Sequence, residues 1–451
     1  MIETTVAGGR LRGELSGDGL VVFRGVPYAR ARRFAPPEPA EPWTGTRDAT
    51  RHGPICPQPP VRVDGVMGPP QNGLVQDEDC LNLTVVTPGV DGTRRPVMVW
   101  IHGGAYVTGA SSFAFYEGRR LAAEGDIVFV AINYRLGALG YLRLPGVSPG
   151  NLGLLDQVSA LRWIKENIEA FGGAPECVTV FGQSAGAHSL ACLMAMPAAR
   201  SLFRRAILQS APLGLKLGSP ARSARMARHF TNALKADPRT APVGEILRAQ
   251  TETIVKVAGP GGLVSPPFCP TGGTGPLPPV RSWLAAAAAA EADVMIGVTR
   301  SEMNGFLNGN PAVRRMERLP VLGRGVAAVK TIAGRWVFET PSRKLADVLS
   351  AAGRRVFTYR FDWAAARSVF GACHCIELPF LLGEREAWAK SPMLEGADRE
   401  TVDRMGRAMR AAWISFARNG TADSWPVHSP GAVPGRCWAA AGSPGTPVAV
   451  P

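Results

Sequence analysis

One serine of this chain stands in a setting that could turn its hydroxyl into a nucleophile. Ser184 lies in the run Gly182-Gln183-Ser184-Ala185-Gly186, which follows an apolar stretch and precedes residues with helical spacing. A turn this tight strains the backbone at the serine, and side chains at the glycine positions would clash. The alternative is a glycine-rich turn without chemistry, but the strand and helix flanks favour a nucleophile that attacks an acyl carbon.

A serine hydroxyl needs a base to take its proton, so a histidine should follow later in the chain. With a nucleophile on such a turn, the acid precedes that histidine in chain order, which leaves His374 and His428 of the six histidines. His374 follows a predicted strand at 355–360 in a loop, where catalytic residues gather at the carboxyl edge of a sheet. His428 stands beside the C-terminal tail. We therefore predict that His374 is the base.

The acid should emerge from the carboxyl end of a strand that lies between the serine and the histidine. Glu302 follows the apolar strand predicted at 294–298, whereas Asp293 precedes this strand and belongs to the opposite edge. A solvated loop carboxylate is the alternative for Glu302. Its position favours the catalytic role.

Negative charge that develops on a carbonyl oxygen needs backbone N–H groups aimed at it. The run His102-Gly103-Gly104-Ala105 ends an apolar strand and matches a loop type that supplies such donors. The amide of Ala185, directly after the nucleophile, adds another donor. For His102 we expect a structural role at the end of the strand.

The segments that carry these residues alternate between apolar strands and helices. This alternation predicts one mostly parallel sheet that helices cover on both faces. At about 212–280 the alternation of strands and helices is less regular, which predicts an inserted, cap-like helical region. The Pro- and Gly-rich tail from 429 to 451 is expected to lie over the surface. The predicted strands lie at 97–101, 127–132, 178–181, 205–209, 294–298 and 355–360, and the predicted helices at 154–168, 185–196 and about 403–418.

Composition narrows the class of protein further. The chain has 451 residues, 46% hydrophobic content and a net charge of +14. The basic residues are dispersed, which favours coding bias over a nucleic-acid surface, so we expect no nucleic-acid partner. The start of the chain lacks a basic and an apolar region of the targeting type, and no uncharged stretch is long enough to span a bilayer. These features predict a cytoplasmic protein without a membrane partner.

The eight cysteines form no CxxC pair, and each is expected to be a small buried hydrophobe. Cys373-His374-Cys375 superficially resembles a metal site. Successive side chains diverge, however, and no second ligand pair stands nearby, so we expect neither a metal nor another cofactor.

Taken together, these residues resemble the type-B carboxylesterase family, which includes bacterial para-nitrobenzyl esterases and cholinesterases. The resemblance covers nearly the whole length. It rests on the glycine-rich turn at 182–186 and on further runs at 23–29, 33–34, 78–83, 133–137, 150–157 and 371–379, the last reading Gly-Ala-Cys-His-Cys-Ile-Glu-Leu-Pro.

The resemblance implies an α/β-hydrolase fold in a single domain over 1–451. It implies that Ser184 is the nucleophile, Glu302 the acid and His374 the base, and it assigns the oxyanion donors to Gly104, Ala105 and Ala185. It also pairs Arg33 with Glu78 and brings Cys56 near Cys80, which we expect to be free thiols in a reducing compartment. Gln183 departs from the pattern, because many members have Glu there.

We therefore expect a serine carboxylester hydrolase that acts through an acyl-enzyme on a small-molecule ester. Two alternatives stay open. One is an acyltransferase, or an enzyme that tailors a secondary metabolite, with the same site but another acceptor in place of water. The other, which the intact triad disfavours, is a non-catalytic binding protein. The natural substrate and the oligomeric state cannot be derived from the sequence.

Overall fold

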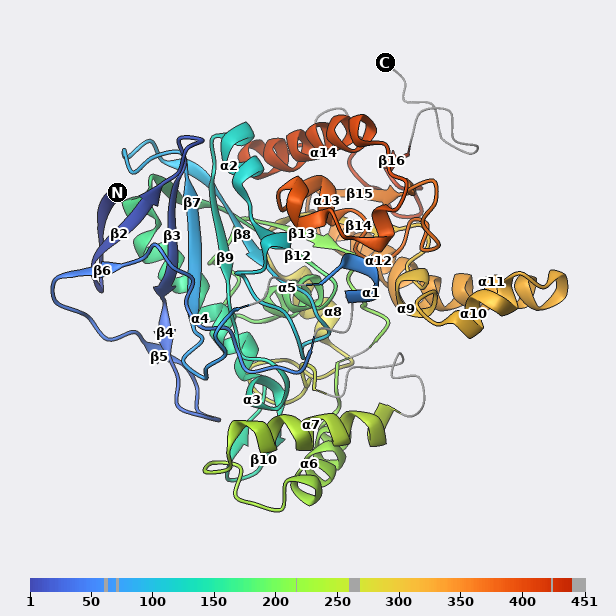
Figure 1. Ribbon diagram of the computed structural model, residues 1–451, viewed down its shortest axis with the longest axis horizontal. Helices are drawn as coiled ribbons and strands as arrows, with labels where there is room; N and C mark the ends of the chain where they lie inside the picture. The colour runs from blue at the N-terminus through green and yellow to red at the C-terminus, as the bar shows by residue number, and fades with distance from the viewer. Residues whose placement is uncertain (61–63, 70–72, 216, 259–267, 423–424, 440–451) are drawn as a thin grey trace.

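The computed structural model describes residues 1–60, 64–69, 73–215, 217–258, 268–422 and 425–439 (Figure 1). Within these residues, the centre of the molecule is a twelve-stranded sheet. Its strands are β1 (Ile2–Val6), β2 (Gly9–Leu15), β3 (Val21–Pro27), β6 (Thr46–Asp48), β7 (Asn82–Thr87), β8 (Arg95–Ile101), β9 (Val128–Ile132), β12 (Gly173–Gln183), β13 (Arg205–Gln209), β14 (Asp293–Thr299), β15 (Val356–Phe361) and β16 (Arg436–Trp438). The small ribbons are β4 (Ala29–Arg30) with β5 (Glu38–Pro39), and β10 (Arg143–Leu144) with β11 (Ser148–Pro149).

The sheet is parallel where it carries the predicted site. The strand order is β1-β2-β3-β7-β9-β8-β12-β13-β14-β15-β16, with β6 beside β2. The neighbours from β9 to β16 are parallel, whereas β1, β2, β3 and β7 add antiparallel pairs at the other edge. Every residue of β9 and β13 is buried, as expected of strands with both faces covered. The predicted mostly parallel sheet is confirmed.

The helical elements lie before, between and after these strands (Figure 1). They are α1 (Asp64–Met67), η1 (Ala114–Tyr116), α2 (Arg119–Gly125), α3 (Gly137–Tyr141), α4 (Leu152–Asn167), η2 (Ile168–Phe171), α5 (Ala185–Ala195), α6 (Pro220–Leu234), α7 (Val243–Ala258), α8 (Trp283–Ala288), α9 (Asn304–Leu307), α10 (Pro311–Glu317), α11 (Pro320–Gly334), η3 (Arg335–Glu339), α12 (Thr340–Ala351), α13 (Leu378–Leu381), η4 (Arg385–Trp388), η5 (Pro392–Leu394) and α14 (Arg399–Asn419).

Two hydrophobic cores lie on the two faces of the sheet, and β8 divides its side chains between them. Val97, Val99 and Ile101 join the core that contains α4, α5 and α12. Met98 and Trp100 join the core that contains α2 and α14. Since successive side chains of a strand point to opposite faces, the helices cover the sheet from both sides. None of the helices in the described part of the chain is long and apolar enough to cross a bilayer.

Two helical excursions extend from the sheet in different directions. α6 and α7 pack against each other and fall within the segment 212–280. The second excursion, α10 and α11, lies outside that segment and was not predicted. Figure 1 shows it projecting from the side of the molecule. That 212–280 acts as a cap stays a prediction.

The C-terminal segment contributes more to the sheet than expected. β16 pairs in parallel with β15, and Trp438 is buried. The expectation that the tail only lies over the surface is therefore wrong for 436–438. Residues 440–451 lie outside the described residues.

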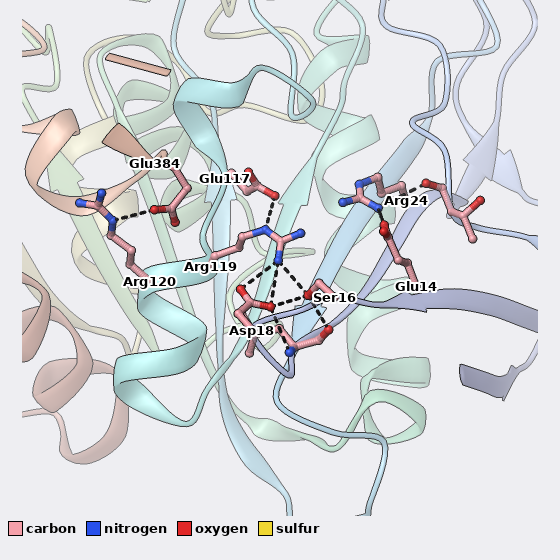
Figure 2. Close-up of polar contacts among 10 residues, drawn as sticks. Glu14, Ser16, Asp18, Arg24, Glu117, Arg119, Arg120 and Glu384 are labelled. Atoms are coloured by element: carbon pink, nitrogen blue, oxygen red, sulfur yellow. Dashed lines mark hydrogen bonds and ion pairs between the residues drawn. The ribbon is translucent and has the colours of Figure 1, made fainter. Parts of the chain in front are cut away.

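Polar contacts hold the turn between β2 and β3 against the start of α2 (Figure 2). Arg119 Nη1 lies 3.0 Å from Asp18 Oδ2 and donates to Ser16 Oγ at 2.9 Å. Its Nε donates to Glu117 Oε1 at 2.7 Å. Since these carboxylates are partly exposed, solvent screens the pairs, and their main effect is to fix the position of the turn.

The structure contains both side-chain pairings that the resemblance implies. Arg33 Nε lies 2.8 Å from Glu78 Oε2, and the same guanidinium donates to the carbonyl oxygens of Pro238 and Ala241. The pair is not fully buried, because the two side chains keep 17% and 26% of their exposure. Cys56 and Cys80 are free thiols, and the hydrogen bond that the Cys80 thiol makes to Cys56, together with burial, raises the pKa of Cys80.

Candidate active site

The turn between β12 and α5 holds Ser184 in a strained conformation. Ser184 has φ +57° and ψ −123°, a region that residues with a side chain rarely adopt. The flanking glycines are needed for close approach. A Cβ on Gly182 would lie 2.7 Å from the Ile101 carbonyl oxygen, and one on Gly186 only 2.0 Å from it. The predicted turn is therefore present, and it presents Ser184 at the carboxyl end of β12.

The predicted acid and base are in direct contact. His374 Nδ1 lies 2.6 Å from Glu302 Oε2, and both side chains are buried. Glu302 Oε1 also accepts a hydrogen bond of 2.8 Å from the Thr299 amide at the end of β14. The contact orients the imidazole and implies that Nδ1 carries a proton, because a carboxylate oxygen can only accept. Nε2 is then the nitrogen available to a nucleophile.

The neighbour at His374 Nε2 is one that sequence reasoning missed. Gln183 Nε2 lies 3.0 Å from it. None of the hydrogen bonds among the described residues joins the Ser184 hydroxyl to His374. Catalytic hydrogen bonds are often long in structures without substrate, so this geometry is compatible with the predicted roles. In this geometry the Gln183 amide and the Ser184 hydroxyl compete for the lone pair of His374 Nε2.

A second glutamate lies near Glu302 and was also missed. Glu377 is buried, and neither carboxylate oxygen makes a hydrogen bond of ordinary distance and angle within the described structure, although the Gln209 side chain lies close enough to lower its pKa slightly. Burial and the nearby Glu302 carboxylate raise the pKa of Glu377 to about 8. Glu377 is therefore protonated at neutral pH. Its place in the apolar run Cys375-Ile376-Glu377-Leu378 was the available signal of its burial.

The loop after β8 has the geometry of an anion-binding turn. Gly104, Ala105 and Tyr106 all have positive φ. The Gly104 carbonyl oxygen accepts hydrogen bonds of 3.1 Å from the amides of Val107 and Thr108, so it is engaged within the loop. In the described part of the chain, the amides of Gly104 and Ala105 have no acceptor. Ala185, as the first residue of α5, likewise has no earlier helical carbonyl to bond.

A cavity of about 430 Å³ brings these groups together. Ser184, His374 and the three predicted donors Gly104, Ala105 and Ala185 line it, whereas Glu302 stands behind the histidine. The remaining lining is mainly apolar, with Phe113, Phe115, Tyr116, Met303, Phe306, Leu307, Val337 and Phe338 among its members. Such a lining favours an apolar ligand that a few polar groups orient.

The wall beside the histidine comes from two short helical segments. The Phe306 ring of α9 and the Phe338 ring of η3 lie 4.9 and 5.1 Å from the His374 ring. η3 is a single stretch of π-helix, a feature that is common at functional sites. These rings limit the movement of the imidazole and keep water from it.

The other buried histidines have different partners. His102 stacks on Tyr134 at 4.4 Å, and burial lowers its pKa to about 4. His188 lies 2.6 Å from the Tyr106 hydroxyl. His428, the other candidate base, lies 2.8 Å from Asp347 instead of Glu302.

Comparison with known proteins extends over most of the chain. A model of the carboxylesterase family matches residues 1–318. A probable N-octanoylanthranilate hydrolase of Rhodococcus erythropolis is 44% identical, over 95% of this chain and 96% of the relative. The para-nitrobenzyl esterase of Bacillus subtilis is 34% identical, over 93% and 91% of the two chains.

Solved structures agree with this similarity. A carboxylesterase of Geobacillus stearothermophilus superposes with a TM-score of 0.78 at 33% identity, over 95% of this chain and 94% of that one. The shared fold is the α/β-hydrolase fold. This chain belongs to the type-B carboxylesterase family.

Proposed function

We propose that the protein hydrolyses carboxylic esters through an acyl-enzyme, with Ser184 as nucleophile, His374 as base and Glu302 as acid. The observation that carries the proposal is the 2.6 Å contact between Glu302 and His374 beside the cavity that Ser184 also lines. It supports a catalytic role because the carboxylate holds the one tautomer whose Nε2 can accept a proton.

The reaction begins with the Ser184 hydroxyl displacing the Gln183 amide from His374 Nε2. The proton of the hydroxyl passes to Nε2 while Oγ attacks the ester carbonyl carbon. The amides of Gly104, Ala105 and Ala185 receive the oxyanion, and donors of this kind contribute about 10²- to 10³-fold each to kcat.

Collapse of the tetrahedral intermediate expels the alcohol, which takes the proton from the imidazolium. Water then enters, gives a proton to His374 and attacks the acyl carbon. The second collapse releases the acid and returns the proton to Ser184. Glu302 holds the imidazolium through both halves of the reaction without becoming protonated.

Covalent labelling tests this assignment. A fluorophosphonate should label Ser184 alone, and Ser184→Ala should lose both the label and the hydrolysis of p-nitrophenyl esters. Ser201→Ala is the control, because Ser201 is exposed and does not line the cavity, so both readouts should stay unchanged. Glu302→Gln should lower kcat by about 10³- to 10⁴-fold. A label on another serine, or hydrolysis by Ser184→Ala at the rate of the parent, contradicts the proposal; a small residual rate does not, because the oxyanion hole and substrate binding still contribute.

A second candidate function is hydrolysis of an N-acyl aromatic amine, which the name of the Rhodococcus relative favours. The same acyl-enzyme serves both reactions, and they differ in the leaving group. N-octanoylanthranilate and p-nitrophenyl octanoate share one acyl chain, so comparing them isolates that difference. Turnover of the ester alone restricts the function to esters, whereas turnover of both assigns amide hydrolysis as well.

A further inference from the structure

α10 and α11 form a structure that the proposed reaction does not use. We call residues 311–336, which comprise α10, α11 and the first two residues of η3, the projecting hairpin. It follows directly on Phe306, Leu307 and Asn310, which line the cavity, and it extends away from the sheet at the side of the molecule (Figure 1). Its inner end therefore borders the cavity.

On α11 the usual relation between polarity and burial is reversed. Every residue of this helix is described, and the one buried residue is Lys330. Its ammonium group donates to Asn308 and pairs with Glu317 of α10. A surface helix normally turns its apolar side inward and its charges outward. In α11 the lysine faces the protein, whereas the apolar side chains of Val321, Leu322, Val329 and Ile332 are exposed.

Exposed apolar side chains accordingly gather on the projecting hairpin. The described residues expose fifteen large apolar side chains, and seven of them lie within these 26 positions. Val321 keeps 83% of its exposure and Ile332 67%. A concentration of this kind marks an interaction site, unlike scattered single residues. The seven are Met316, Leu319, Val321, Leu322, Val329, Ile332 and Trp336.

The charge of the projecting hairpin indicates the partner. It contains six basic residues and one acidic residue, Glu317, which Lys330 already neutralises. The guanidinium groups of Arg315, Arg318 and Arg324 are exposed beside the apolar side chains. A twofold contact with a second copy would place this basic surface against itself, at a cost in like-charge repulsion. An anionic surface that accepts apolar side chains complements both properties.

We propose that the projecting hairpin docks the protein on a bilayer of anionic phospholipid. Its apolar residues enter the boundary between head groups and acyl chains, Trp336 lies at the level of the head groups, and the arginines contact the phosphates. The contact is peripheral. It departs from the sequence expectation of no membrane partner, which rested on the absence of a spanning segment.

Docking in this position would deliver lipophilic esters directly to the cavity. The delivery of substrate from the bilayer rests on the proposed esterase activity. The binding of the projecting hairpin to lipid does not, because it needs no catalysis. The two proposals can therefore fail separately.

The test is co-sedimentation of the full chain with vesicles of phosphatidylcholine, alone or mixed with phosphatidylglycerol. Binding should require the anionic lipid and weaken in about 0.5 M NaCl. The variant with Val321→Ser and Leu322→Ser should partition about tenfold more weakly, because two apolar side chains no longer leave water. Val433→Ser is the matched control, since Val433 is 81% exposed at a distant position in the chain and should bind like the parent.

Tryptophan fluorescence gives an independent readout. Among the residues that the structure describes, Trp336 is the one tryptophan with an exposed side chain, so brominated lipid should quench it in the parent and quench Trp336→Phe less. Hydrolysis of a soluble ester should stay unchanged in the serine variant. Equal sedimentation of parent and serine variant, or no binding to anionic vesicles, overturns the proposal. So does a dimer in light scattering that the serine variant dissociates, because it assigns the surface to a second copy.

Discussion

Glu377 should make the protein less stable as the pH rises, and Glu377→Gln should abolish this effect. The side chain is buried near the Glu302 carboxylate, and both effects raise its pKa to about 8 from an ordinary value of 4.5. Between these two values the folded state holds a proton that the unfolded state has released. Stability therefore falls as the pH rises through this window, and it is constant below and above it.

The magnitude follows from the width of the window. The pKa values of about 8 and 4.5 differ by about 3.5 units, and each unit corresponds to about 1.4 kcal/mol. Glu377 alone should thus lower the free energy of unfolding by about 5 kcal/mol between pH 4.5 and pH 8. A glutamine of the same shape has no proton to lose, so its contribution does not change with pH.

Urea unfolding of parent and variant, measured at intervals from pH 5 to pH 9, gives the difference directly. The variant should gain stability relative to the parent as the pH rises, and the gain should level off above pH 8. Glu166→Gln is the control, because Glu166 is exposed on α4 and should show no such trend. If the curves of parent and Glu377→Gln stay parallel over the whole range, Glu377 does not hold a proton at neutral pH.

Three further predictions follow from contacts already described. Glu78→Gln should lower the free energy of unfolding by about 1 to 3 kcal/mol in urea, because Arg33 loses a partner in a partly buried pair; an unchanged midpoint contradicts this. Gln183→Glu should move the acid limb of kcat/KM up by about one pH unit, because a carboxylate beside Nε2 favours the protonated form of His374; a coincident profile contradicts it. Because the Gly104 carbonyl is engaged within its loop, it leaves room for a bulky alcohol group, and both tert-butyl acetate and n-butyl acetate should be hydrolysed. Turnover of n-butyl acetate alone would refute this interpretation.

The parallel part of the sheet could be predicted because its strands are buried on both faces. Strands of this kind have continuous apolar runs, such as the one in β8, and each run ends at the edge where the site lies. The contact between Glu302 and His374 was predictable for the same reason, since both follow strands that end at that edge. Chain order left both His374 and His428, and the loop that follows the strand at 355–360 separated His374 from His428.

Features that depend on packing could not be predicted. β2, which lies between β1 and β3, alternates charged residues with Gly or Leu, so it has no apolar run. α11 presents its apolar residues outward, and only the fold shows that they are exposed. The contact of Gln183 with His374 depends on a side-chain rotamer, and the proton on Glu377 depends on its burial beside Glu302.

The charges around His374 suggest why Gln183 and Glu377 occur together. The imidazolium that forms during the reaction faces Glu302, while Gln183 is uncharged and Glu377 holds its proton at neutral pH. One positive charge thus meets one negative charge in a buried site, where a second unpaired carboxylate would be costly. Above about pH 8, Glu377 loses its proton and adds a second negative charge. At that pH the buried site should therefore carry a negative charge on Glu377 beside Glu302, whereas in Glu377→Gln it should not.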